Sequence, residues 1–476
     1  MKPSPLTAIT QAAVLAFGAA VAGGASAQST ADLMKEIQAL KARVAELEGK
    51  QAKPGAAASS AHWGMTPEQA AEFNRIAVKT EAMEDARDAS GLKLLKISGY
   101  MDPAFIYNKR QDRAGFQFLN AVSDDGYNYD NSYFGAAVID FQKETDNGSR
   151  WRLTLSSNRG VGAVIDGQSP VHEASVSIPL TDLQTRFIAG QIPDWSGYEY
   201  LQPTLNKLIT HNMLFDFTLP AAYTGAGMEV TSGKWIVKGV LANMNSTRRT
   251  SGNTAPVVSY RVDYSRGEFQ GFGFAGVHGK AANLTENVTQ TSNIDVVDLS
   301  GNVIGSTPVT EVVAQPDSRV DLFEVDGYFI RGDWTVQGQL SVGKQKAASV
   351  TPGPSGELRD ASWYGGSGLV AYKFTPRFEG TARFDYLYNR KNGGGLLGYT
   401  ASDDRNGIGP DPAGDPDVGA NRTALTFGAS WLLNLNTTFK AEYRIDRADL
   451  PVFIDVKSGT YSKSNQLFGA SVLVAF

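Results

Sequence analysis

The 476-residue sequence contains no cysteine. This absence excludes a disulfide framework, a thiolate metal site, a cysteine nucleophile and a lipid-modified cysteine. The formal net charge is −5, so the chain also lacks the basic excess expected of a nucleic-acid-binding protein. After the N-terminal region, no run of about 18 consecutive apolar residues could form a membrane-spanning helix. The sequence therefore predicts neither a nucleic-acid-binding protein nor a helical membrane protein.

Histidine is scarce, with only four residues, and no catalytic arrangement surrounds any of them. The segment at 365–369, Gly-Gly-Ser-Gly-Leu, lacks the final glycine of a nucleophile elbow. The segment at 271–276, Gly-Phe-Gly-Phe-Ala-Gly, matches a dinucleotide fingerprint, but it lies within a strand pattern and no helix follows. An acidic loop at 403–417 could bind calcium, but it lacks the glutamate that completes a calcium loop. We predict no enzyme activity, no catalytic residue, no metal and no cofactor.

Residues 1–27 have the pattern of a secretory signal peptide. Lys2 precedes an apolar run at 12–22, and the small residues Ala25-Ser26-Ala27 follow it. The apolar run is too short for an uncleaved membrane anchor, which is the alternative interpretation. We expect cleavage before Gln28 and export from the cytoplasm.

Residues 28–50 have the heptad spacing of a coiled-coil helix. A helix of this length is only marginally stable alone in water. We therefore expect its apolar seam to be buried against other copies of the chain. A lone helix lying on another surface is the alternative. β-Branched residues at one seam position with leucine at the other nominally favour a coiled coil of two helices. The predicted oligomerisation residues are Leu33, Ile37, Leu40, Val44 and Leu47.

A linker at 51–65, rich in small residues and containing one proline, precedes a second predicted helix at 66–91. Thr66 and Gln69 have the spacing of a capping box, with Pro67 at the first helical position, and Gly91 provides an end. We expect both helices in the periplasm. The second could lie under a barrel mouth or on its rim.

From residue 92 onward, apolar and polar residues alternate in segments of about ten, which is typical of strands with one apolar and one polar face. Trp235, Val237 and Leu241 share one such face, for example. The intervening charged sets, such as Arg150 and Arg152, could not be buried in a dry core and need water. Residues 92–476 are therefore expected to form a transmembrane barrel with a wet interior.

Connection lengths predict the topology, because outer-membrane barrels alternate short periplasmic turns with long outer loops. The alternation is strict if the apolar stretch 213–219 belongs to the third long loop, at 192–221, and is not a strand. The predicted fold class is all-β: a transmembrane antiparallel β-barrel of about 16 strands preceded by the two helices. Counts of 14 or 18 remain alternatives.

Two features resemble known outer-membrane proteins. The last strand ends at the aromatic residue Phe476, which resembles the signature recognised by the barrel-assembly machinery. The segments at 190–199 and 220–225, with Asn206 between them, resemble putative β-barrel porin families of Gram-negative bacteria. With the coiled coil and the barrel size, the chain resembles trimeric dicarboxylate-type porins. The resemblance implies a homotrimer in the outer membrane, in contact with lipid and lipopolysaccharide, that passes small polar solutes.

The third loop is the candidate to fold inward, because Met213-Leu214-Phe215 should not lie in open water. Covering the rim or a neighbouring subunit is the alternative. A basic wall facing an acidic loop would create a transverse field, with a lean towards anionic solutes, whereas paired charges would simply keep the lumen wet. The predicted constriction residues are Asp194, Glu199, Lys207 and Asp216. The predicted pore-lining residues are Arg150, Arg152, Arg186, Lys238, Arg261, Glu324, Asp326, Arg383, Asp385 and Arg444.

Two other kinds of protein compete with this interpretation. The chain could be a structural anchor whose coiled coil faces the cell wall, or a barrel hydrolase. An importer with a plug domain is disfavoured, because the segment before residue 92 is too small to form a plug.

Overall fold

The structure is a computed structural model that describes residues 66–118, 135–156, 169–245, 256–281, 288–297, 303–313, 318–397 and 401–476. The chain divides into two compact units, Met1–Ala89 and Ser90–Phe476. The predicted signal peptide, coiled-coil seam and linker all lie outside the described residues, so they stay predictions.

The first unit contains the helix α3 (Pro67–Ala89), close to the predicted bounds of 66–91. Its N-terminus is a capping box: the Gln69 amide donates to Thr66 Oγ1 at 3.2 Å, and the Thr66 amide donates to Gln69 Oε1 at 2.9 Å. No helix in the described part of the chain is long and apolar enough to cross a membrane.

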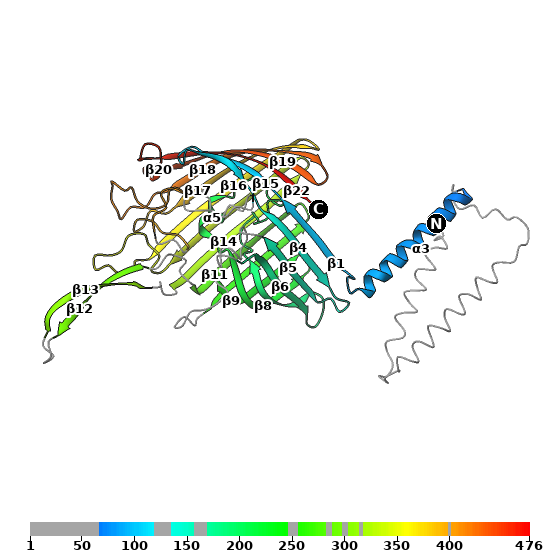
Figure 1. The fold of residues 1–476 in the computed structure, drawn as a ribbon, viewed down its shortest axis with the longest axis horizontal. Coiled ribbons are helices and arrows are strands. Elements are labelled where there is room, and N and C mark those ends of the chain that lie inside the picture. The colour runs from blue at the N-terminus through cyan, green and yellow to red at the C-terminus, as the bar shows by residue number, and fades with distance from the viewer. Residues whose placement is uncertain are drawn as a thin grey trace, which may run out of the picture. The chain divides into compact units, whose positions relative to one another are not determined.

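In the described part of the second unit, sixteen strands form a closed antiparallel barrel, which confirms the predicted fold class (Figure 1). The first strand is in two pieces, β1 (Leu95–Met101) and β2 (Ala104–Asn108). Both pieces pair with the last strand, β22 (Ser464–Ala475), which closes the ring. On its other side the first strand pairs with β4 (Ala137–Glu144) and with the short β3 (Arg113–Gln117).

The other barrel strands follow around the ring in chain order. They are β5 (Arg150–Ser156), β6 (Val171–Pro179), β7 (Thr185–Pro193), β8 (Ala222–Ser232), β9 (Trp235–Met244), β10 (Val257–Gly267), β11 (Gln270–Ala281), β14 (Ser318–Arg331), β15 (Trp334–Gln345), β16 (Ala361–Thr375), β17 (Phe378–Tyr388), β18 (Arg422–Asn434) and β19 (Thr437–Ala448). Two hairpins form separate two-stranded sheets: β12 (Val288–Val297) pairs with β13 (Val303–Val313), and β20 (Phe453–Asp455) pairs with β21 (Thr460–Ser462).

Short joints and long connections alternate around the ring, as predicted. At the joint between β14 and β15, Gly332 has a φ of 57°, a left-handed conformation that glycine adopts at no steric cost. The third long connection contains the helix α5 (Met213–Thr218) in place of a strand. The Asn212 side chain begins this helix by accepting a hydrogen bond from the Phe215 amide at 2.9 Å.

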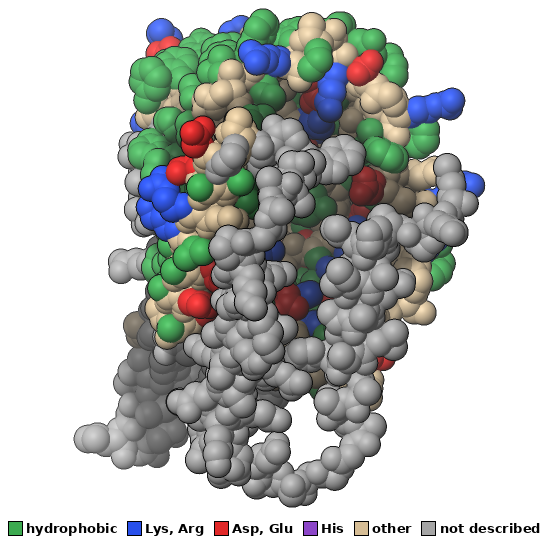
Figure 2. Space-filling view, turned by 90° about the vertical axis from the view of Figure 1, so that its right-hand side faces the viewer, with side chains coloured by type: hydrophobic (Ala, Val, Ile, Leu, Met, Phe, Trp, Pro, Cys, Tyr) green, Lys and Arg blue, Asp and Glu red, His purple; other side chains and the backbone are tan. Residues whose placement is uncertain are grey.

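The two faces of the barrel wall differ in polarity. On β15, Val336, Leu340 and Val342 point outward with 40%, 68% and 51% of their surface exposed, whereas Gln339 and Ser341 point inward and are buried. In Figure 2, hydrophobic side chains dominate the upper edge, with some basic and acidic ones among them, and further acidic and basic side chains lie deeper in. The wall is therefore apolar outside and polar inside, the reverse of a soluble barrel.

Candidate functional site: the barrel interior and its third loop

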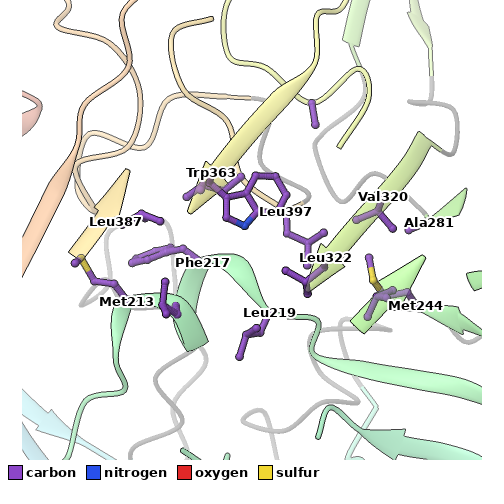
Figure 3. Packing of buried hydrophobic residues seen from close by; sticks show 14 of the residues in the cluster. Met213, Phe217, Leu219, Met244, Ala281, Val320, Leu322, Trp363, Leu387 and Leu397 are labelled. Atoms are coloured by element: carbon purple, nitrogen blue, oxygen red, sulfur yellow. The ribbon is translucent and has the colours of Figure 1, made fainter. Parts of the chain in front are cut away.

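The third long connection, residues 194–221, packs inside the barrel against the inward faces of β14 to β19. Its helix α5 contacts β15, β16 and β17. Met213, Phe217 and Leu219 join a buried cluster with Trp363 and Leu387 from the wall (Figure 3). We call residues 194–221 the inner loop. Burial of these side chains provides the apolar part of its attachment to the wall.

A small residue in the wall allows this close approach. Gly365 on β16 lies so near α5 that an added Cβ would meet Leu214 Cδ2 at 2.6 Å. Such a distance is shorter than van der Waals contact, so a side chain at this position would push the helix away from the wall.

Two buried arginines hold the inner loop by its backbone. Arg383 Nη1 contacts Glu199 Oε1 at 2.7 Å and donates to the Thr210 carbonyl at 2.7 Å. The His211 carbonyl accepts from Arg383 Nη2 and from Arg444 Nη1, each at 2.8 Å. These charge-assisted bonds satisfy carbonyls that would otherwise be buried without a partner.

Acidic and basic side chains elsewhere on the wall complete the attachment. Glu442 Oε2 accepts hydrogen bonds from the backbone amides of Ile209 at 2.6 Å and Thr210 at 3.0 Å. Lys440 Nζ donates to two loop carbonyls, those of Pro203 at 2.7 Å and Asn206 at 2.6 Å. The loop is therefore fixed by donors and acceptors of both signs.

These contacts change the interpretation of four predicted pore-lining residues. Glu324 and Arg383 are 1% exposed, and Asp385 and Arg444 are fully buried. Glu324 Oε1 accepts from the Gly197 amide of the loop at 2.7 Å. The prediction that these four face open water is corrected, because the inner loop covers them.

The predicted acidic edge of the loop is corrected for the same reason. Glu199 contacts Arg383 directly, and Asp194 Oδ1 accepts from the Tyr223 hydroxyl at 2.6 Å. Asp216 is 1% exposed, and Lys207 Nζ contacts Glu379 at 2.8 Å. Among the residues that the structure describes, these side chains are therefore engaged or buried and do not form an acidic loop edge facing a basic wall.

His211 and Asp216 lie together within the inner loop, with Nδ1 and Oδ1 3.9 Å apart. Burial lowers the pKa of His211 to about 3 and raises the pKa of Asp216 to about 7. The His211 ring also stacks on Phe215 with centroids 4.1 Å apart. At neutral pH the histidine is therefore neutral.

The wall formed by β4 to β6, across the ring from the loop's attachment, carries a second charged group. Arg152 Nε contacts Asp140 Oδ1 at 2.9 Å, and Arg152 Nη1 contacts Glu173 Oε2 at 3.2 Å. The Arg152 side chain is 34% exposed, which makes it one of the more accessible inward cations. Its charge is compensated by the two carboxylates beside it.

The remaining predicted wall residues also have partners. Arg261 Nη1 contacts Asp326 at 2.7 Å and donates to the Trp195 carbonyl of the inner loop at 2.8 Å. Lys238 Nζ lies 5.2 Å from the Trp195 ring centroid, a cation–π contact. Arg186 is buried and donates to the Gly148 carbonyl at 2.7 Å, so it supports a short joint.

Arg150 also lies by a short joint, where it contacts Glu144 at 3.1 Å with 57% of its side chain exposed. Loop residues that take part in the attachment, above all Ile209, Thr210 and Asn212, were not among the predicted site residues. Only Asn212 had a local signal, since asparagine before an apolar run is a helix N-cap pattern.

The fold resembles several solved barrels, with low sequence identity and modest structural agreement. OmpT of Vibrio cholerae has 10% identity and a TM-score of 0.47, covering 80% of this chain and 97% of that one. The anion-selective porin of Comamonas acidovorans has 12% identity and a TM-score of 0.46, covering 80% and 99%. The Salmonella typhi OmpF complex with daunomycin has 11% identity and a TM-score of 0.48, covering 80% and 97%.

A comparison with curated proteins found no match. One protein-family model, described as "protein of unknown function (DUF3138)", matches residues 7–476, which is nearly the whole chain. The chain therefore belongs to the DUF3138 family.

Proposed function

We propose that the protein is an outer-membrane porin through which small polar solutes diffuse passively. The observation that carries this proposal is the wall itself: a closed ring of sixteen strands with an apolar outer face and a charged inner face. An apolar outer face of this kind matches hydrocarbon, and a ring of this size leaves an aqueous channel.

Aromatic side chains at the short-joint end of the barrel support a membrane setting. Trp334 packs on Tyr372 with centroids 4.6 Å apart, and Trp235 packs on Tyr264 at 4.7 Å. Trp235 and Trp334 are 42% and 51% exposed on the outward face. Aromatic girdles at the two membrane interfaces are a general feature of transmembrane barrels.

The inner loop is proposed to narrow the channel. It covers the inward faces of β14 to β19 and also contacts β8, β9 and β10 through Asp194 and Trp195, so the free passage lies between the loop and the wall of β4 to β7. Tyr200 and Leu205 are 55% and 57% exposed on the loop, and we propose that they form its solute-facing edge.

The charges that border this passage favour weak selectivity. Arg152 and Arg261 have adjacent carboxylates, and Lys238 lies over an aromatic ring. Local pairing of this kind keeps the lumen wet without creating a strong field of one sign. We propose a mild preference for anions from the sequence, because the predicted pore-lining residues on the earlier strands are all basic.

The remaining parts of the proposal rest on the sequence. The residues before the barrel would lie in the periplasm, where the predicted coiled coil would join three copies, as in the dicarboxylate-type porins that the chain resembles. Outer-membrane lipid, lipopolysaccharide and the barrel-assembly machinery would be its partners, the last through Phe476.

Planar-bilayer recording tests the proposal. The folded protein should give stepwise currents, and deletion of 206–220 from the inner loop should increase the single-channel conductance. An equally long deletion within the hairpin at 288–313, whose strands β12 and β13 form a sheet separate from the barrel, is the control and should leave conductance unchanged. A folded protein that gives no current would favour the anchor alternative, and equal conductance in the two deletions would exclude the constriction.

A further inference from the structure

The outward face of the barrel carries a charged patch where β11, β14, β15 and β16 meet the long connections. Strand register places Lys280 opposite Arg319, and Asp321 opposite Lys344. The Lys346 amide donates to the Arg319 carbonyl at 2.9 Å, which extends the row to the next strand. We call the following six residues the rim patch: Lys280, Arg319, Asp321, Lys344, Lys346 and Asp360.

The rim patch has four basic and two acidic side chains, so its formal charge is +2. Asp321 is engaged by Arg319 at 3.0 Å and by His278 at 3.1 Å, and Asp360 lies 3.9 Å from Lys346. Within the described part of the chain, Lys280 and Lys344 form no ion pair with an acidic side chain. Two exposed cations therefore stay uncompensated on this face.

An apolar row lies directly below the rim patch, towards the middle of the barrel. Register aligns Phe323 with Val342, Val342 with Tyr364, and Tyr364 with Tyr388. The two tyrosine rings stack with centroids 4.5 Å apart. Phe323, Val342 and Tyr364 are between 41% and 51% exposed, so the row presents a largely open apolar surface.

A groove of about 450 Å³ joins the two features, since its lining includes Asp321 and Lys344 from the patch and Phe323, Val342 and Tyr364 from the row. Side chains two residues apart on a strand are separated by about 7 Å, so the polar and apolar parts of one small amphipathic molecule could contact both.

We propose that this groove binds a phosphorylated, acylated lipid of the outer leaflet. Lys280 and Lys344, the two uncompensated cations, would bind a phosphate group, and an acyl chain would lie along Phe323, Val342 and Tyr364. This inference rests on the proposed function, which puts the outward face in hydrocarbon and the long connections at the outer surface. The charge of +2 selects an anionic head group and disfavours a second copy of the same patch as the occupant.

The test measures lipid binding to the full-length protein by native mass spectrometry after delipidation in a non-ionic detergent. The probes are bisphosphorylated lipid A, the same lipid without its phosphates, and inorganic phosphate. The variant Lys280→Gln/Lys344→Gln should bind bisphosphorylated lipid A about 30-fold more weakly, the effect of two surface cations on an anionic lipid. Arg331→Gln/Lys373→Gln, at the short-joint ends of β14 and β16, is the matched control and should bind as the parent does.

A separate variant tests the role of the groove. Val342→Trp, which fills it without changing charge, should weaken binding of the phosphorylated lipid and leave the heat-modified migration of the folded barrel unchanged. Equal binding of the phosphate-free lipid, equal loss in the control pair, or competition by inorganic phosphate at the lipid's own affinity would each overturn the inference. Bilayer currents recorded on the same samples report on the proposed function separately, because the outward variants should conduct as the parent does.

Discussion

Replacing Arg383 by methionine tests whether the buried ion pairs hold the inner loop in the barrel. Arg383 is 1% exposed and contacts Glu199 at 2.7 Å and Asp385 at 3.2 Å. Methionine fills a similar volume but leaves both carboxylates buried without this cation. Breaking a buried ion pair by removing one partner costs about 3–5 kcal/mol. The Thr210 and His211 carbonyls also lose a donor, so the upper part of that range applies.

This free energy should appear as local opening of the loop, because the strand ladders on either side of β17 do not depend on Arg383. The amides of Ile209 and Thr210, which donate to Glu442, report on the docked loop. Their hydrogen exchange should accelerate by roughly three to three and a half orders of magnitude, while amides in the β17 ladder should exchange at the parent rate.

Two further variants make the reasoning refutable. Glu199→Gln in the Arg383→Met background removes one of the two carboxylates that lost their cation. It should recover part of the lost protection of the loop amides against hydrogen exchange. Arg150→Gln removes a solvent-exposed arginine, 57% accessible and paired with Glu144, and should change protection by less than about 1 kcal/mol. Unchanged exchange at Ile209 and Thr210 in folded Arg383→Met would show that the arginine does not hold the loop.

Two other predictions concern pH and charge. Burial raises the pKa of Asp216 to about 7, so ionisation of this carboxyl destabilises the docked loop above pH 7, and the cost disappears as the pH falls towards 4. Asp216→Asn should therefore slow hydrogen exchange of the loop amides at pH 8 and not at pH 4. The same effect at both pH values would contradict the raised pKa of Asp216. Arg152→Gln leaves Asp140 and Glu173 without their shared cation, so the reversal potential across a salt gradient should shift in the direction of greater cation selectivity. Arg150→Gln, at the exposed arginine, is the control. A shift in the direction of greater anion selectivity would exclude Arg152 from the passage.

Much of the barrel could be predicted because its signals are local. Alternation with period two assigns each residue to a face of the sheet, and short joints such as that at Gly332 are visible in the sequence. The stretch 213–219 was ambiguous in isolation, since it resembles a strand. Only the strict alternation of connections assigned it to the third loop, where the structure shows α5.

The candidate site was only partly predictable, because strand phase gives the direction of a side chain and not what covers it. Arg383 and Arg152 both follow the inward pattern, yet Arg383 is buried under the loop and the Arg152 side chain is 34% exposed. Glu442 accepts a hydrogen bond from the Thr210 amide, but the two residues are 232 positions apart in the sequence, so no local pattern relates them. Such pairs meet only when the ring closes and the loop folds back into it.

The amino-acid sequence alone determined that this chain forms a closed barrel with an apolar exterior and a charged interior, because the pleat of a strand converts alternation directly into two faces. Only the tertiary structure decided which charged side chains of the interior bind the inner loop and which lie on the wall that the loop does not cover. The path of that loop depends on the combined fit of Leu214 beside Gly365 and of Glu199 beside Arg383, contacts between distant segments that sequence spacing does not record.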